Sequence, residues 1–215
     1  MWGRLKYVLV KLLIRAALAL FARVEVAGLE NVPSSGAFIL VINHVHILDP
    51  PLILAVFPRR ITVLIARKWK RWPISVLPTA LNAIYVDRGQ VDREALRKCL
   101  RVLEQGGVLG MSPEGTRSHS PGMQRARPGV AYIAYKAGVP IVPVGIVGMN
   151  RIFDGITRFR RTRVRVIIGV PFELPPIDLH GPHRHEELRK ASDEIMYRLA
   201  KLLPRDYQGA YRVES

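Results

Sequence analysis

Short apolar runs alternate along this chain with stretches of helical periodicity, and this alternation restricts the fold more than any other feature. The runs at residues 38–42, 61–66 and 141–147 consist mainly of Val, Ile and Leu. Strands that are apolar on both faces must be covered on both faces, as in a parallel sheet flanked by helices. We therefore expect an α/β protein with a largely parallel or mixed central sheet flanked by helices.

The remaining elements follow from the same two periodicities. Strands are expected at residues 24–27, 83–86, 108–111 and 163–170, and helices at residues 52–57, 91–105, 128–137 and 183–203. The length of 215 residues suits one such domain. We assign residues 23–215 to that domain and residues 1–22 to an N-terminal membrane-associating helix.

The excess of basic residues indicates an anionic partner. The chain has 33 Lys and Arg against 17 Asp and Glu, a formal charge of +16. Nucleic acid, an anionic membrane surface and a phosphorylated substrate would each satisfy this charge. Cys99 is the one cysteine, which leaves no internal disulfide and favours a reducing compartment. We expect it to be a small core residue of its helix.

Residues 1–22 form a helix pattern that is apolar around most of its circumference. Arg4, Lys11 and Arg15 fall within one narrow sector at 100° per residue. We interpret this segment as a helix that lies in a membrane interface, with these cations toward the lipid head groups. The corresponding expectation is a peripheral or monotopic protein on the cytoplasmic face of the cell membrane.

Three other interpretations of this helix stay open. A signal peptide needs a continuous apolar region, which Lys11 and Arg15 interrupt. A transmembrane anchor needs about 20 apolar residues, whereas the longest uncharged run is residues 16–22. The third interpretation is a helix packed on the core of the domain.

A polar cluster follows the apolar run at residues 38–42. If a helix begins near Ile47, the carboxylate of Asp49 can return to the imidazole of His44. A carboxylate on one ring nitrogen fixes the tautomer and leaves the other nitrogen as a general base. A loop with a helix cap before Pro50 explains the same residues equally well on local evidence.

A second polar cluster, residues 112–118, also follows an apolar run and contains Glu114 and Arg117. Polar residues that leave the carboxyl ends of strands are where α/β proteins build their sites. Two clusters of this kind in one chain therefore favour a functional interpretation of both.

Residues 67–72 form a basic patch interleaved with tryptophans. It is either the solvated start of a helix or a contact for a membrane or a phosphate, because Trp suits the head-group boundary and cations bind phosphate. On the second interpretation, Lys68 is a substrate-binding residue.

Four short motifs occur in order along the chain. They are NHVHILD at residues 43–49, YVDR at 85–88, PEGTR at 113–117 and VPIVPV at 139–144. Together they closely resemble the four motifs of the glycerolipid acyltransferases, specifically the lysophosphatidic acid (1-acyl-glycerol-3-phosphate) acyltransferases. The resemblance spans roughly residues 25–150, and four ordered motifs are far more specific than one.

The resemblance implies transfer of a fatty acyl group from a thioester of CoA or acyl carrier protein to a lysophospholipid hydroxyl, above all that of 1-acylglycerol 3-phosphate, which gives phosphatidic acid. It implies that His44 is the general base and that Asp49 orients it. A thioester is already activated, so the protein needs a base and donors for the developing oxyanion, and no covalent enzyme intermediate. No cofactor and no metal is expected.

The resemblance also implies an acceptor site. Arg88 and Arg117 would bind the acceptor's phosphate, for which a planar, bidentate cation suits better than lysine. Glu114, Gly115 and Thr116 would shape the same site. The expected partners are the acyl thioester, the lysophospholipid and an anionic membrane surface, and not nucleic acid.

The chain departs from the family pattern at two positions. Ser112 replaces a bulky apolar residue before the third motif, and His46 stands where serine often follows the catalytic histidine. Both departures bear on the acceptor head group. His46 also leaves open a metal-dependent hydrolase that uses His44, His46 and Asp49. A second alternative is a non-catalytic basic protein that binds membrane or nucleic acid.

Overall fold

The computed structural model describes residues 2–67, 83–87, 92–118 and 122–212. Within these residues, seven strands form one sheet in the order β1-β7-β6-β2-β5-β3-β4. Neighbouring strands are parallel except β6 and β7, which are antiparallel. The strands are β1 (Ala22–Ala27), β2 (Phe38–Ile42), β3 (Ile61–Ala66), β4 (Ile84–Val86), β5 (Val108–Met111), β6 (Ile141–Val147) and β7 (Thr162–Ile168). The expected α/β fold is confirmed.

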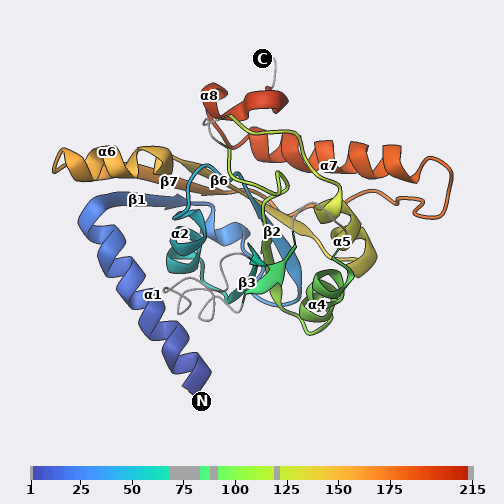
Figure 1. Ribbon diagram of the computed structural model, residues 1–215, viewed down its shortest axis with the longest axis horizontal. Coiled ribbons are helices and arrows are strands. Elements are labelled where there is room, and N and C mark those ends of the chain that lie inside the picture. Colours follow the sequence, from blue (N-terminus) through green and yellow to red (C-terminus); the bar gives the residue numbers. More distant parts are fainter. Residues whose placement is uncertain (1, 68–82, 88–91, 119–121, 213–215) are drawn as a thin grey trace.

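Helices cover both faces of this sheet (Figure 1). They are α1 (Trp2–Phe21), α2 (Asp49–Val56), α4 (Arg93–Glu104), α5 (Gly129–Ala137), α6 (Ile152–Thr157), α7 (Arg184–Ala200) and α8 (Arg205–Gln208). Short 3-10 turns at η1 (Leu29–Asn31), η3 (Met149–Arg151) and η4 (Gly209–Tyr211) complete the connections.

The central strand β2 divides the core into two layers. Phe38, Leu40 and Ile42 pack on one face of the sheet, with α2, α6 and the end of α1. Ile39 and Val41 pack on the other face, with α4, α5 and α7. A strand buried on both faces is why this run has no polar alternation. Cys99 lies in the second layer, as expected.

Several segments differ from the sequence expectation, among them residues 205–211, where α8 and η4 were not expected. Helix α2 begins at Asp49 rather than at residue 52, because prolines stand in its first turn, where a missing N–H costs nothing. No element was expected in residues 148–161, where η3 and α6 lie. Such short helices carry too few periodic positions to be recognised, and α6 is held by Ile152 in the core.

Helix α1 packs against α2, and the side of α1 that contacts α2 is the one that carries Lys11. Lys11 Nζ donates a hydrogen bond of 2.6 Å to the carbonyl of Phe57, just past the end of α2. The guanidinium of Arg60 lies over the ring of Tyr7, and Leu18 packs on the core. The expectation that Lys11 faces lipid head groups is therefore wrong, because the carbonyl end of α2 attracts the cation.

The opposite side of α1 is apolar and exposed. Its exposed large residues are Leu5, Val8, Leu9, Leu12, Leu13, Leu20 and Phe21. Figure 1 shows the N-terminal half of the helix extending away from the sheet. Among the helices of the described residues, none is both long and apolar enough to cross a membrane.

Candidate active site

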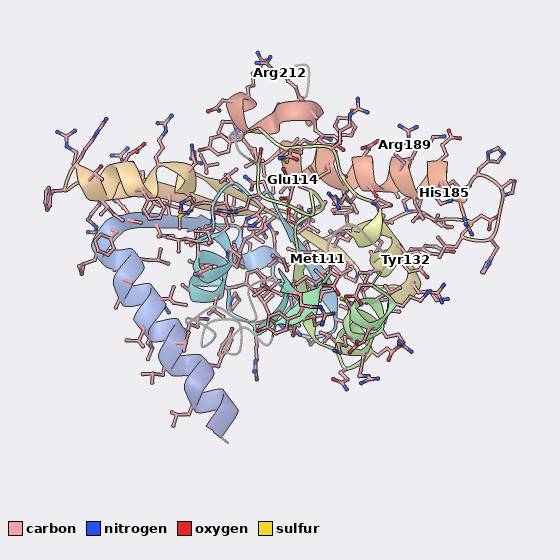
Figure 2. All side chains as sticks on the ribbon, viewed as in Figure 1. Met111, Glu114, Tyr132, His185, Arg189 and Arg212 are labelled. Atoms are coloured by element: carbon pink, nitrogen blue, oxygen red, sulfur yellow. The ribbon has the colours of Figure 1, made fainter. Side chains whose placement is uncertain are left out.

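The two polar clusters of the sequence meet at the carboxyl ends of adjacent strands. Strands β2 and β5 are parallel neighbours, with Val41 opposite Met111. The loops that follow them carry His44 and Glu114, and Figure 2 shows Glu114 in the middle of the molecule. Parallel pairing therefore brings together residues that lie 70 positions apart.

His44 and Asp49 form a buried pair. The Nδ1 atom of His44 lies 2.9 Å from Oδ2 of Asp49, whose side chain is 0% exposed. The same oxygen accepts hydrogen bonds from the backbone N–H groups of Val45 (2.9 Å) and His46 (2.7 Å). Asp49 is the first residue of α2, and these three contacts hold its carboxylate toward the His44 loop.

The contact with Asp49 determines which nitrogen of the His44 imidazole carries the proton. A carboxylate beside Nδ1 keeps the proton on that nitrogen, so the lone pair of His44 is on Nε2. The side chain of His44 is 15% exposed. Among the residues that the structure describes, none bonds to Nε2. The pair can therefore take a proton from a hydroxyl that reaches Nε2.

Glu114 holds the main chain of His44. Its Oε1 accepts from the N–H of His44 at 3.0 Å, and its Oε2 from the N–H of Gln124 at 2.9 Å. The carbonyl of His44 accepts in turn from the N–H of Ser118 at 2.8 Å. Burial raises the pKa of Glu114, and the two amide bonds oppose that rise. Both carboxylate oxygens are thus committed to backbone rather than facing outward.

The PEGTR motif, residues 113–117, forms a tight turn around Glu114. Gly115 has a φ of 69°, and its N–H donates to the carbonyl of Ser112 at 3.0 Å. A Cβ at Gly115 would lie 2.7 Å from Cδ of Arg127. Glycine meets both the positive φ and the close approach. The Ser112 hydroxyl is buried without a hydrogen-bond partner in the described part of the chain.

Arg117 lies at the exposed rim of the site, next to half-buried Thr116. Its charge acts on His46, whose pKa is lowered mainly by burial, against the attraction of Asp49, and further by Arg117. The guanidinium of Arg117 therefore adds positive charge near His46, two residues from His44. Lys68 and Arg88 lie outside the described residues.

Asn43, which sequence reasoning recorded only as part of a motif, ties the site to the sheet. Its side chain accepts from the N–H of Ile146 (2.8 Å) and donates to the carbonyl of Ile146 (2.9 Å). It is fully buried. The amide thereby extends the pairing of β2 with β6 by one residue and fixes the start of the His44 loop. The sequence feature that could have indicated this role is an Asn directly after the apolar run at residues 38–42.

His46 is engaged in local contacts. Its Nδ1 accepts from the N–H of Leu48 at 3.3 Å, and its ring meets that of Phe153 edge-on, 4.9 Å between centroids. Across residues 2–67, 83–87, 92–118 and 122–212, no three His, Cys, Asp or Glu side chains gather as a metal site would require. The geometry therefore lends no support to the hydrolase alternative.

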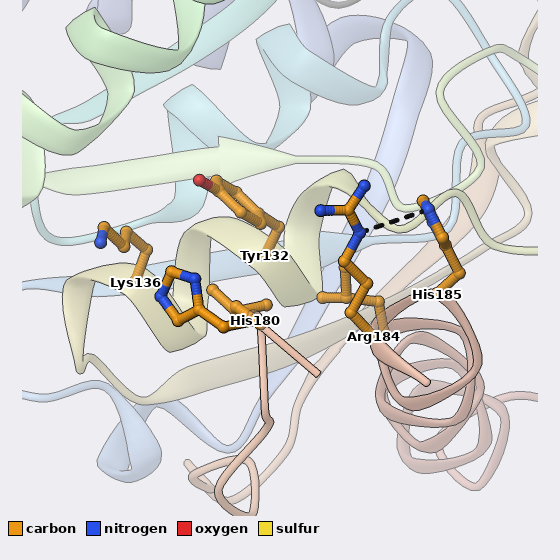
Figure 3. Close-up of a pocket in the computed structure, with 7 residues that line it drawn as sticks. Tyr132, Lys136, His180, Arg184 and His185 are labelled. Carbon is orange, nitrogen blue, oxygen red and sulfur yellow. Dashed lines mark hydrogen bonds between the residues drawn. The ribbon is translucent and has the colours of Figure 1, made fainter. Parts of the chain in front are cut away.

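A surface pocket lies away from this site, between α5, the segment before α7 and the first turns of α7 (Figure 3). It is lined by Tyr132, Lys136, Leu179, His180, Arg184, His185 and Leu188. Helix α5 starts beside Gly115, where Arg127 donates to Pro113, and runs away from it toward Lys136. Neither His44 nor Asp49 lines this pocket.

A histidine whose Nδ1 faces a buried carboxylate, at the strand ends of an α/β sheet, has the geometry of a general base. The acyltransferase family model matches residues 23–147 of this chain, which spans both clusters. The chain belongs to the acyltransferase family.

Similar proteins carry more specific names. A 1-acyl-sn-glycerol-3-phosphate acyltransferase of Borreliella burgdorferi is 27% identical, over 70% of this chain and 62% of that protein. A chloroplastic one of Brassica napus is 31% identical, over 74% and 48%. The chain therefore spans about half to three fifths of the length of these relatives.

A solved structure is also similar. The crystal structure of the 1-acyl-sn-glycerophosphate acyltransferase PlsC from Thermotoga maritima matches with a TM-score of 0.69 and 28% identity. The match covers 91% of this chain and 78% of that one.

Proposed function

We propose that this chain is a lysophosphatidic acid acyltransferase, which moves a fatty acyl group from a CoA or acyl carrier protein thioester to 1-acylglycerol 3-phosphate and forms phosphatidic acid. The observation that carries the proposal is the 2.9 Å contact between His44 Nδ1 and Asp49 Oδ2, which leaves Nε2 with its lone pair. The names of the similar proteins supply the substrate class.

The proposed reaction needs one proton transfer in each direction. Nε2 of His44 takes the proton of the acceptor hydroxyl as its oxygen attacks the thioester carbonyl. The carbon–sulfur bond then breaks, and the thiolate leaves and takes up the proton from the imidazolium. Asp49 stabilises that imidazolium through Nδ1 without moving a proton itself. The acyl group passes directly from sulfur to oxygen.

The acceptor's phosphate is assigned to the rim of the site. Arg117 is exposed and close enough to His46 to affect its titration. We assign it, with Arg88 of the second motif and Lys68, to the phosphate, and Thr116 to the same head group. Glu114 acts as a positioning residue, because its oxygens hold the backbone of His44 and Gln124.

Membrane association is assigned to residues 1–22. The exposed apolar side of α1 suits the boundary between head groups and acyl chains of a bilayer. Lys11 is committed to α2, so the apolar side, rather than a row of cations, makes this contact. We propose that the enzyme lies at the cytoplasmic face of the cell membrane.

The test is an assay of the purified chain with acyl-CoA and with acyl carrier protein thioester, against a panel of lysophospholipids, followed by mass spectrometry of the products. Phosphatidic acid should form from lysophosphatidic acid faster than any other product. His44→Ala should abolish it, whereas His180→Ala, a histidine in the surface pocket, serves as the matched control. Transfer that requires added zinc and stops with a chelator would overturn the proposal in favour of a metal enzyme.

A further inference from the structure

The turn between α6 and β7 places a phenylalanine where helices usually end in glycine. The N–H of Arg160 donates to the carbonyl of Gly155 at 2.9 Å, and that of Phe159 to Ile156 at 3.2 Å. This pair of bonds is the Schellman arrangement, in which the first residue past the helix cap takes the left-handed conformation. Phe159 has a φ of 52° and is the one non-glycine residue with positive φ in the described part of the chain.

The described part of the chain provides no packing that would compensate for this conformation. The side chain of Phe159 is 100% exposed, so it contributes no packing to the core. A bulky residue in the left-handed region is strained, and a fully hydrated aromatic ring adds the cost of its exposed apolar area. If a partner outside the chain buries the ring, the exposed apolar area is removed from water, and this gain offsets the backbone strain.

The charges around the ring indicate what that partner is. Residues 151–165 contain arginines at 151, 158, 160, 161, 163 and 165 against one acid, Asp154. All six arginines are exposed, although Arg161 also donates to the carbonyl of Ala22. On the neighbouring strand β1, Arg23 stands opposite Arg163 and Glu25 opposite Arg165. An exposed aromatic residue flanked in sequence by Arg158, Arg160 and Arg161 suits the head-group boundary of an anionic bilayer.

The position of the turn is consistent with a membrane contact near the site. Leu18 of α1 and Ile156 of α6 pack on the same core layer, and Figure 1 shows the far end of α6 pointing outward beyond the C-terminal end of α1. At the other end of α6, Phe153 is 54% exposed and its ring meets His46. Helix α6 therefore runs from the Phe159 tip to the edge of the candidate active site.

We propose that the α6–β7 turn, residues 157–161, inserts Phe159 into an anionic bilayer as a second membrane contact beside α1. The two contacts together hold the α6 edge of the site, marked by Phe153 and His46, against the lipid surface. The inference concerns lipid contact and not acyl transfer, so it is tested by measurements that need no activity.

The first test labels position 159 in the full chain. Phe159→Cys is modified with an environment-sensitive fluorophore, and Cys99 stays unlabelled because it is buried and burial raises its pKa to about 12. The matched control is Val170→Cys, an exposed position at the opposite end of β7. With phosphatidylglycerol–phosphatidylcholine vesicles, the label at 159 should shift to the blue and be quenched by lipid-borne quenchers, and the label at 170 should not.

The second test separates the function of the ring from its effect on folding. Phe159→Gly suits the left-handed backbone and should leave the melting temperature unchanged or raised, yet weaken vesicle binding about tenfold. Arg158→Gln and Arg160→Gln should each weaken binding to anionic vesicles about fivefold. A chain that co-sediments with vesicles while the label at 159 stays as hydrated as that at 170 overturns the proposal and leaves α1 as the membrane contact. Absence of co-sedimentation overturns both contacts.

Discussion

The carboxylate of Glu114 accepts a hydrogen bond of 3.0 Å from the backbone N–H of His44, across 70 residues of chain. Its other oxygen holds the N–H of Gln124. The carboxylate thus joins the loops after β2 and β5, and the position of the histidine depends on a residue that need not touch substrate. This relationship leads to the first two predictions.

Glu114→Gln should lower both stability and turnover. The amide has one acceptor oxygen, so its NH₂ group must face one of the two backbone N–H groups. Loss of that bond in a buried place should cost about 1–3 kcal/mol of unfolding free energy, and displacement of His44 should lower kcat by up to about a hundredfold. Urea unfolding and steady-state kinetics measure the two effects. Glu94→Gln, an exposed carboxylate paired with Lys98, is the control and should change neither.

The pH dependence of stability should carry the signature of the same residue. Burial raises the pKa of Glu114 above its ordinary value of 4.5 in the folded chain. The folded state then binds this proton up to a higher pH than the unfolded state, so its contribution to stability falls as pH rises from 4.5 through the folded pKa. The difference in unfolding free energy between wild type and Glu114→Gln should shrink across that window. A difference that grows with pH there would contradict the raised pKa.

His44→Ala should lower the rate of acyl transfer about a hundred- to ten-thousandfold, since it removes the positioned base. Asp49→Asn separates charge from geometry. An amide oxygen in place of Oδ2 can still accept from the N–H groups of Val45 and His46, which Oδ2 bonds at 2.9 and 2.7 Å. The fold should therefore persist while the rate falls by no more than in His44→Ala. Circular dichroism and initial rates test this, and full activity in either variant would exclude the proposed base.

Arg117→Ala should weaken the acceptor more than the thioester. Loss of a charge-assisted hydrogen bond to phosphate costs about 1.5–3 kcal/mol, or one to two decades in binding. Arg117→Lys should recover only part, because lysine cannot bind phosphate in a bidentate manner. The measurement is the KM of each substrate in turn. An acceptor KM that does not change would place the phosphate elsewhere.

The orientation of α1 predicts that its leucines, and not Lys11, contact the membrane, whereas the sequence analysis expected Lys11 to face the lipid head groups. Replacing Leu9, Leu12 and Leu13 together with Ser removes exposed apolar area, and should weaken vesicle binding about a hundredfold or more without lowering the melting temperature. Lys11→Gln should do the reverse: it loses a bond to Phe57 worth about 1 kcal/mol of stability and keeps vesicle binding. Weaker binding of Lys11→Gln to anionic vesicles would mean that this cation faces lipid after all.

The sequence by itself determined the type of fold and the spacing of the histidine and aspartate in the candidate site. The run at residues 38–42 is apolar at every position, so only a strand buried on both faces could hold it, and β2 is central in the sheet. The spacing of His44 and Asp49 is local, five residues within one loop and one helix start. Such short-range geometry depends on few dihedral angles, so the sequence could predict this pairing. A helix cap fitted the same residues equally well, and the structure decided between the two.

Only the tertiary structure decided which groups face one another over long separations. The sector of α1 that contains Lys11 looked suited to lipid, but the carbonyl end of α2 competes for the lysine, and no property of residues 1–22 shows that end. Likewise Glu114 looked like part of the acceptor site, and parallel pairing of β2 with β5 turned its oxygens to the backbone of His44. Periodicity records which face of an element is buried, whereas the partner on that face is set by how the strands are ordered in the sheet.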